Sequence, residues 1–274
     1  MNDIYRTAAG GQAVREHYRG QLDHWPVDAE RLVLPTRSGE TFVVASGPVD
    51  APPVVALHGS GGNSTTWLAD IAVWAPHLRV HSVDLIGEPG LSAPTRPELG
   101  SDEHERWLDD VFDGLGLEKA AVLGMSLGGW LAIDYATRRP ERVTKLALLA
   151  PGGIGRRTSG WMVKALPLFA LGAWGRRRVV GIVTGTDLGP MRDAIAATFR
   201  HFRPRVEIPV FDDATLTRLT MPTLVVVGDR DVMISSAETV RRLASTVPHA
   251  DVRVLPGVGH LVQGQAHAVL EFLR

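Results

Sequence analysis

The sequence contains no cysteine, and this absence removes several classes of chemistry. A chain without thiols forms no disulfide, has no thiolate nucleophile and builds no cysteine-ligated zinc site. Other metal and cofactor signatures are missing too, because His104-Glu105 lacks the second histidine four residues on that a zinc-binding helix requires. The glycine-rich segments do not form a dinucleotide-binding fingerprint between a strand and a helix. We therefore expect no metal site and no cofactor.

Long apolar runs and an excess of one charge are lacking as well. No segment approaches the ~20 apolar residues of a membrane span, and residues 1–20 mix charged and small residues instead of forming a signal peptide. Lysine and arginine number 29 against 30 aspartates and glutamates, so nothing in the overall charge points to nucleic acid. We expect a cytoplasmic protein without stable membrane insertion or a nucleic-acid partner, existing as a monomer or a homodimer.

The chain does contain short β-branched apolar runs that alternate with longer helical patterns, which is typical of parallel βαβ units. Its 274 residues suffice for one large α/β body. The expected strands cover residues 31–36, 41–46, 54–57, 80–85, 120–123, 143–150, 223–227 and 252–255. The expected helices cover residues 13–22, 65–75 (capped by Ser64 or Thr65), 102–115, the stretch up to Arg138, 236–245 and 265–273.

This rhythm fails between Pro151 and Asp212, where the chain is rich in Gly, Arg, Trp and Phe. Helical pieces are expected only near residues 161–171 and 191–202. An insertion flanked by strands is most simply a cap over the end of the sheet where α/β folds place their sites. The predicted division is a helical N-terminal extension, a core and a helical cap, comprising residues 1–30, residues 31–152 with 213–274, and residues 153–212.

The predicted cap is strongly basic, with ten arginines and lysines between Arg156 and Arg205 against two aspartates. One interpretation is that some of these arginines bind or steer an anionic substrate. The other is a solvated face balanced by acidic helices elsewhere, and both interpretations stay open. The aromatic side chains of this segment predict an apolar underside.

The segment Gly124-Met125-Ser126-Leu127-Gly128 matches the pattern G-x-S-x-G. A strand precedes it and a helix follows at once, which is the context that a nucleophile elbow needs. The two glycines leave room for the backbones that approach the turn. Ser126 is therefore the predicted nucleophile.

A serine hydroxyl needs a base and a carboxylate that orients the base. His260 follows the last predicted strand in a glycine-containing loop, which makes it the predicted base. Two aspartates, Asp229 and Asp231, follow the end of the expected strand 223–227. Asp231 is the predicted acid because it lies further from the strand end, where it can reach the imidazole. Asp229 is nearer to the strand end, where it can cap the turn or pair with Arg230.

A tetrahedral intermediate also needs hydrogen-bond donors for its oxyanion. The N–H of Leu127 at the start of the elbow helix and the N–H of Ser60 in the loop 58–62 are the predicted pair. The helix dipole at Leu127 favours negative charge at the same place. Trp161 and Met125 are the predicted substrate contacts.

The order Ser126, Asp231, His260 with an upstream His-Gly loop resembles the α/β-hydrolase fold family, in its serine-nucleophile, carboxylesterase-like branch. The resemblance covers residue 31 to the C-terminus. It implies an eight-stranded, mostly parallel sheet flanked by helices, a helical cap after the sixth strand, and an acyl-enzyme mechanism. Residues 83–92 are similar to the family's D-x-x-G-x-G-x-S loop, except that Glu88-Pro89 replaces the usual short polar link. We expect that loop to brace the site without a catalytic role.

Three functions are compatible with this pattern. The leading one is hydrolysis of a carboxylic ester or related small acyl compound through an acyl-enzyme intermediate. Carbon–carbon bond hydrolysis of a keto acid is an alternative that suits the basic cap, although Met125 replaces the asparagine usual in that branch. A non-catalytic ligand-binding protein on the same fold is the third.

Overall fold

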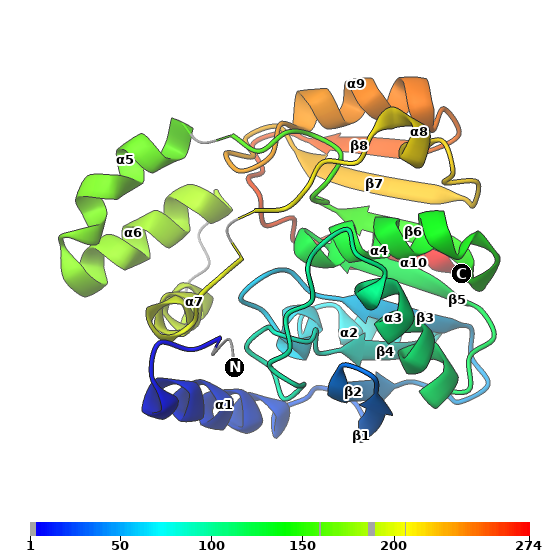
Figure 1. Ribbon diagram of the computed structural model, residues 1–274, viewed down its shortest axis with the longest axis horizontal. Coiled ribbons are helices and arrows are strands. Elements are labelled where there is room, and N and C mark those ends of the chain that lie inside the picture. The colour runs from blue at the N-terminus through cyan, green and yellow to red at the C-terminus, as the bar shows by residue number, and fades with distance from the viewer. Residues whose placement is uncertain (1–3, 159, 186–189, 206) are drawn as a thin grey trace.

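The computed structural model describes residues 4–158, 160–185, 190–205 and 207–274, and its centre is one eight-stranded sheet (Figure 1). The strand order is β1-β2-β4-β3-β5-β6-β7-β8. The strands are β1 (Ala29–Thr36), β2 (Gly39–Ser46), β3 (Pro53–Leu57), β4 (Arg79–Val83), β5 (Ala120–Met125), β6 (Val143–Leu149), β7 (Thr223–Gly228) and β8 (Asp251–Leu255).

Strand β2 pairs antiparallel with both β1 and β4, whereas every other pairing in the sheet is parallel. The sheet therefore has the mostly parallel, eight-stranded form that was expected. Parallel strands deliver their carboxyl ends to one edge, so the loops after β3, β5, β6, β7 and β8 meet there. The candidate site is built from these loops.

Helices cover both faces of the sheet, as Figure 1 shows. The helices α3, α4, α8 and α9 pack on one face, and α2 and α10 pack on the other. The helical elements are α1 (Ala8–Leu22), η1 (Ser64–Trp67), α2 (Ile71–Trp74), α3 (Glu103–Gly114), α4 (Leu127–Arg138), η2 (Pro140–Arg142), α5 (Gly160–Phe169), α6 (Gly172–Thr184), α7 (Pro190–His201), α8 (Asp213–Leu216), α9 (Ser236–Thr246) and α10 (Ala266–Leu273).

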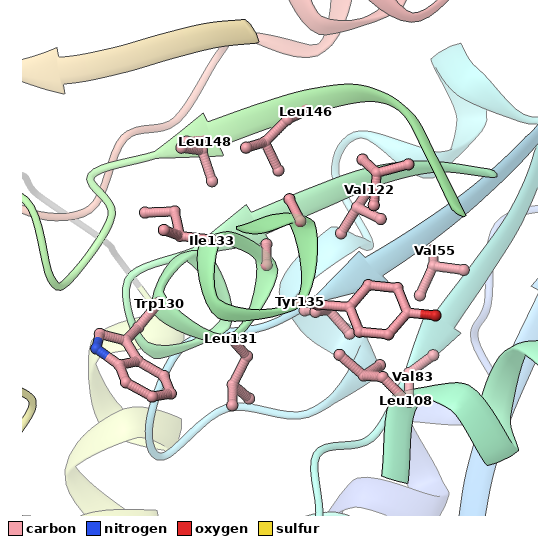
Figure 2. Close-up of a cluster of buried hydrophobic side chains, with 14 of the residues drawn as sticks. Val55, Val83, Leu108, Val122, Trp130, Leu131, Ile133, Tyr135, Leu146 and Leu148 are labelled. Atoms are coloured by element: carbon pink, nitrogen blue, oxygen red, sulfur yellow. The ribbon is translucent and has the colours of Figure 1, made fainter. Parts of the chain in front are cut away.

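Helix α4 lies in the middle of the larger core. Figure 2 shows its side chains Trp130, Leu131, Ile133 and Tyr135 pointing to different sides among apolar residues of the sheet and of α3. Nearly every residue of the helix is buried, which explains why its sequence is apolar all round instead of amphipathic. The helix that begins beside Ser126 is therefore fixed on all sides.

The predicted helix over 65–75 is wrong, because the chain forms the separate short turns η1 and α2 there. The predicted cap is wrong as well, since the side chain of Asn63 accepts the hydrogen bond from Thr65 N–H at 3.1 Å. The Ser64 hydroxyl is instead oriented toward the core, where it donates to Asp84 at 2.7 Å. A tertiary contact thus overrides the local capping preference.

Three helices, α5, α6 and α7, lie between β6 and β7 and form what we call the inserted segment. The sequence predicts helices near the positions of α5 and α7 but does not predict α6. Its three glycines and the run Arg176 to Arg178 interrupt the apolar period that would have revealed a helix. Figure 1 shows the three helices standing beside the end of the sheet.

The last helix of the inserted segment is tied to the start of the chain. Arg6 N–H donates to His201 O at 2.7 Å, and Arg203 N–H donates to Ile4 O at 2.9 Å. Between these bonds the buried rings of Tyr5 and Phe202 meet edge to face, with centroids 6.4 Å apart. Residues 4–6 therefore act as a short strap, here called the N-terminal strap, across the end of α7.

Arg242 of α9 holds the two places where the inserted segment leaves and rejoins the core. Its guanidinium donates to Ile154 O at 2.5 Å, to Phe211 O at 2.6 Å and to the carboxylate of Asp213 at 2.6 Å. The Arg242 side chain is 10% exposed, and its bond to Ile154 O is buried. One buried cation thus clamps both ends of the insertion.

We predict that Arg242→Met lowers the free energy of unfolding by about 3 kcal/mol, because two buried carbonyls lose their donor. The neighbouring Arg241 is the matched control, since its side chain is 71% exposed and its contact with Glu238 spans 3.6 Å. Arg241→Met should change stability by less than ~0.5 kcal/mol. Urea unfolding followed by tryptophan fluorescence measures both, and equal effects of the two substitutions would contradict the clamp.

Candidate active site

Ser126 joins β5 to α4 in a backbone conformation that residues other than glycine rarely adopt, with φ 52° and ψ −109°. Its N–H donates to Leu149 O at 3.0 Å, and its carbonyl accepts from Trp130 N–H at 3.0 Å and Gly152 N–H at 2.9 Å. Such strain persists only where the surroundings over-determine it, and it concentrates at functional sites. The turn therefore has the geometry of the predicted elbow.

The two glycines of the pattern are required by close backbone contacts. A Cβ on Gly124 would lie 2.5 Å from Gly128 O, and one on Gly128 would lie 2.1 Å from Leu57 O at the end of β3. Both positions therefore exclude any larger residue. Their absence of side chains lets the elbow sit directly against the neighbouring strand end.

The structure brings together the three predicted side chains. His260, in the loop after β8, has its Nε2 atom 2.9 Å from Ser126 Oγ and its Nδ1 atom 2.7 Å from Asp231 Oδ2. The imidazole is 12% exposed, whereas the Asp231 side chain is 1% exposed. Because a carboxylate only accepts, Nδ1 carries the proton and Nε2 is left to accept from the serine hydroxyl.

The two aspartates after β7 have different partners. The second oxygen of Asp231 accepts from Met233 N–H at 2.7 Å and Ile234 N–H at 3.0 Å, which fixes the carboxylate beneath the imidazole. Asp229 instead accepts from Gly257 N–H at 2.7 Å and so stabilises the turn that begins the His260 loop. This separation agrees with the sequence-based choice between them.

The loop after β3 lies against the elbow. A Cβ on Gly59 would lie 3.4 Å from Ser126 Cβ. The ring of His58 is fully buried and bridges Gly59 O, at 2.8 Å, and Leu85 N–H, at 3.0 Å, while burial lowers its pKa and keeps it neutral. In the described part of the chain, the N–H groups of Ser60 and Leu127 donate to no protein acceptor. Both therefore remain available to a ligand.

Asp84, at the end of β4, anchors the loop that resembles the family's D-x-x-G-x-G-x-S pattern. This buried carboxylate accepts from Tyr18 Oη at 2.9 Å, Ser64 Oγ at 2.7 Å and Leu91 N–H at 2.8 Å. It therefore connects α1, η1 and its own loop. These contacts support the bracing role that was expected for this segment.

Glu88 is a residue whose importance sequence reasoning missed. Its side chain is buried, and Oε2 accepts from Gly61 N–H at 2.7 Å and Ser60 Oγ at 3.1 Å. Burial raises the pKa of Glu88 to about 7, although Arg96 and Arg205 nearby act in the opposite direction. The carboxylate thus holds the loop that carries the Ser60 N–H. The available signal was the replacement of the usual polar link by Glu88-Pro89.

The two predicted substrate contacts lie in different places. Met125 is the last residue of β5 and is buried in the smaller core cluster, next to the nucleophile in sequence. Trp161 is half-buried in the first turn of α5. Contact of either residue with substrate stays a prediction. Another part of the inserted segment reaches the site, because Leu261 N–H donates to Thr184 O at 3.4 Å beside His260.

Two further features concern only the described residues. They contain no group of three or more histidine, aspartate or glutamate side chains placed to hold a metal ion. They also include no helix that combines the length and the apolar character needed to cross a bilayer.

Comparison with known proteins agrees with this geometry. The model of the alpha/beta hydrolase family matches residues 54–272. The uncharacterized carboxylesterase nap of Bacillus subtilis is 32% identical over 89% of this chain and 85% of its own length. The crystal structures of carboxylesterase CesB (YbfK) and of naproxen esterase, both from Bacillus subtilis, superpose with a TM-score of 0.83 each. Their identities are 31% and 30%, and the alignments cover 96% of both chains and 97% of both chains, respectively.

The chain therefore belongs to the alpha/beta hydrolase family. It is a hydrolase, and these similar relatives within the family are carboxylesterases.

We predict that Glu88→Gln changes the pH dependence of stability. The folded pKa of Glu88 is raised from 4.5 to about 7, so its contribution is fully present below about pH 4.5 and is lost as the pH rises through 7. The loss is on the order of 3 kcal/mol, and the glutamine variant should lack it. Urea unfolding between pH 5 and 8 measures the difference.

Buried histidines such as His81 and His104, whose pKa values burial lowers to about 4, contribute in the opposite direction. They do so equally in both proteins and therefore cancel in the comparison. If the free energy of unfolding changes with pH by the same amount in the wild type and in Glu88→Gln, the Glu88 carboxyl group is not the cause of this pH dependence.

Proposed function

We propose that the protein hydrolyses small carboxylic esters, with Ser126 as nucleophile, His260 as general base and Asp231 as the orienting acid. The observation that carries this proposal is one hydrogen-bonded line from Asp231 through His260 to Ser126, with bonds of 2.7 and 2.9 Å. Two N–H groups without protein partners lie beside its serine end. The carboxylesterase relatives support the same chemistry.

In the first half of the proposed reaction, His260 Nε2 takes the proton of Ser126 as Oγ attacks the ester carbonyl carbon. The carbonyl oxygen becomes an oxyanion, which accepts from the N–H groups of Ser60 and Leu127. Each such donor is worth roughly 3 kcal/mol of transition-state stabilisation. The imidazolium then protonates the leaving alcohol oxygen, the C–O bond breaks, and the acyl group stays on Ser126.

In the second half, a water molecule gives a proton to His260 and attacks the acyl carbon. The same two N–H groups donate to the second oxyanion, and the proton returns to Ser126 Oγ as the carboxylic acid leaves. Asp231 keeps Nδ1 protonated and stabilises the imidazolium in both halves. Its own two backbone donors hold it in place for this task.

The inserted segment is proposed to limit access to this site as a cap formed by residues 153–212. This proposal is supported by its contact with the His260 loop at Thr184 and by Arg242, which holds both of its ends to the core. Trp161 and Met125 are retained as proposed substrate contacts. Residues 1–30 are proposed as a separate helical extension, joined to the cap through the N-terminal strap.

We predict that Ser126→Ala lowers kcat/KM for p-nitrophenyl acetate and butyrate by at least ~10⁴-fold and abolishes labelling by a fluorophosphonate probe. Only an activated serine reacts with such a probe. A dienoic keto acid offered at equal concentration tests the carbon–carbon hydrolase alternative. Preferential turnover of the keto acid would reject ester hydrolysis as the main activity, and wild-type protein that takes no label would favour a binding protein.

We predict that Asp231→Asn lowers kcat by about 10³–10⁴-fold, because the amide favours the wrong tautomer of His260. Asp229→Asn is the matched control, as it lies two residues away and binds only the backbone of Gly257. It should retain activity within about tenfold. Steady-state kinetics on the same esters compares them, and a larger loss for Asp229→Asn would reverse the assignment.

A further inference from the structure

The connection between α5 and α6 carries an unusual group of exposed apolar side chains. Leu166 is 73% exposed, Leu171 is 55% exposed and Trp174 is 58% exposed. Figure 1 shows this connection at the end of the inserted segment that is farthest from the sheet. We call residues 166–178 the cap tip.

This exposure is concentrated in one place. Among the described residues, seven large apolar side chains are exposed, and the four outside the cap tip are valines: Val33, Val49, Val210 and Val254. Single exposed apolar residues are ordinary on protein surfaces. The two leucines and the tryptophan instead lie within nine residues of one another, and such grouping marks an interaction surface.

Basic side chains lie directly beside this apolar group. Arg176, Arg177 and Arg178 follow Trp174, and the guanidinium of Arg178 lies 5.9 Å from the centre of the Trp174 ring. An open concavity of about 310 Å³ is lined by Trp174, Arg177, Arg178 and Arg192. The ion pair of Arg177 with Asp193, at 2.6 Å, brings a carboxylate to this group.

Taken together, the geometry points to a surface that binds an anionic lipid bilayer. Leu166, Leu171 and Trp174 would enter the interface between headgroups and acyl chains, where tryptophan is favoured. The arginines would lie at the level of the lipid phosphates, with the concavity between α6 and α7 receiving one of them.

Charge complementarity favours an anionic bilayer over a second copy of the chain as the partner of this surface. A two-fold contact through the cap tip would place the same arginine cluster opposite itself, which repels. A negatively charged bilayer instead offers complementary charge and an apolar layer beneath it. Binding of this kind is peripheral and reversible, because three side chains and a few arginines give far less affinity than a spanning helix.

The test uses the full chain and sedimentation with vesicles of phosphatidylglycerol or of phosphatidylcholine at low salt. We expect binding to the anionic vesicles, a blue shift of tryptophan emission, and loss of binding as salt is raised. The triple substitution Arg176→Gln, Arg177→Gln and Arg178→Gln should weaken binding by about 100-fold, or roughly fivefold per arginine. The substitutions Leu166→Ser, Leu171→Ser and Trp174→Ser should also weaken it.

Matched controls change exposed arginines and exposed apolar residues elsewhere. The exposed arginines Arg19, Arg218 and Arg241 replaced by glutamine, and Val33 and Val49 replaced by serine, should leave vesicle binding within about threefold. Turnover of a soluble p-nitrophenyl ester should be unchanged in the cap-tip variants, which verifies that they fold.

Several results would overturn the proposal. These are equal binding to both kinds of vesicle, no binding to the anionic ones, or binding that the cap-tip variants retain. A dimer in sedimentation velocity that the same variants dissociate, without any vesicle binding, would assign the surface to a second copy of the chain. Vesicle binding is read without ester turnover, so its failure is distinguishable from a failure of the proposed enzymatic function.

Discussion

The left-handed backbone of Ser126 is the constraint on which the rest of the site depends. A non-glycine residue in this conformation is strained by roughly 1–3 kcal/mol and must be held by its surroundings. Three backbone hydrogen bonds from different segments hold it, and Gly124 and Gly128 let neighbouring backbones approach closely enough to do so. Helix α4, buried all round, prevents the turn from relaxing. The hydroxyl is thereby presented at the sheet edge where the loops after β7 and β8 deliver the carboxylate and the imidazole.

Carboxylates on neighbouring loops extend this fixed geometry outward. Asp231 sets the imidazole, Asp229 sets the turn before it, and Asp84 joins three elements behind the elbow. Glu88 does the same for the loop of Ser60 by accepting from Gly61 N–H and Ser60 Oγ, and burial raises its pKa to about 7. In the proposed oxyanion site, backbone packing therefore fixes the N–H of Leu127. The ionisable carboxyl group of Glu88 holds the loop with the N–H of Ser60, so the two donors are fixed in different ways.

Much of the fold and the candidate triad was predictable, because the signals are local. Strands buried on both faces read as continuous apolar runs, and the elbow has a fixed spacing of glycines around Ser126. The preference for Asp231 over Asp229 also rested on position relative to one strand end. The failures arose where contacts distant in sequence decide the structure: Asp84 withdraws Ser64 from its capping role, and Glu88 becomes significant only once its loop folds against Gly61. Helix α6 was missed because its stability comes from packing on its neighbours, not from the period of its own sequence.

The N-terminal strap is joined to the end of α7 through paired backbone bonds at Ile4, Arg6, His201 and Arg203. Phe199 of α7, one turn before Phe202, lies where a side chain on Gly61 would clash with its ring, so α7 rests on the loop that carries Ser60. A substitution in residues 4–6 that displaces α7 would consequently shift the loop that carries the Ser60 N–H.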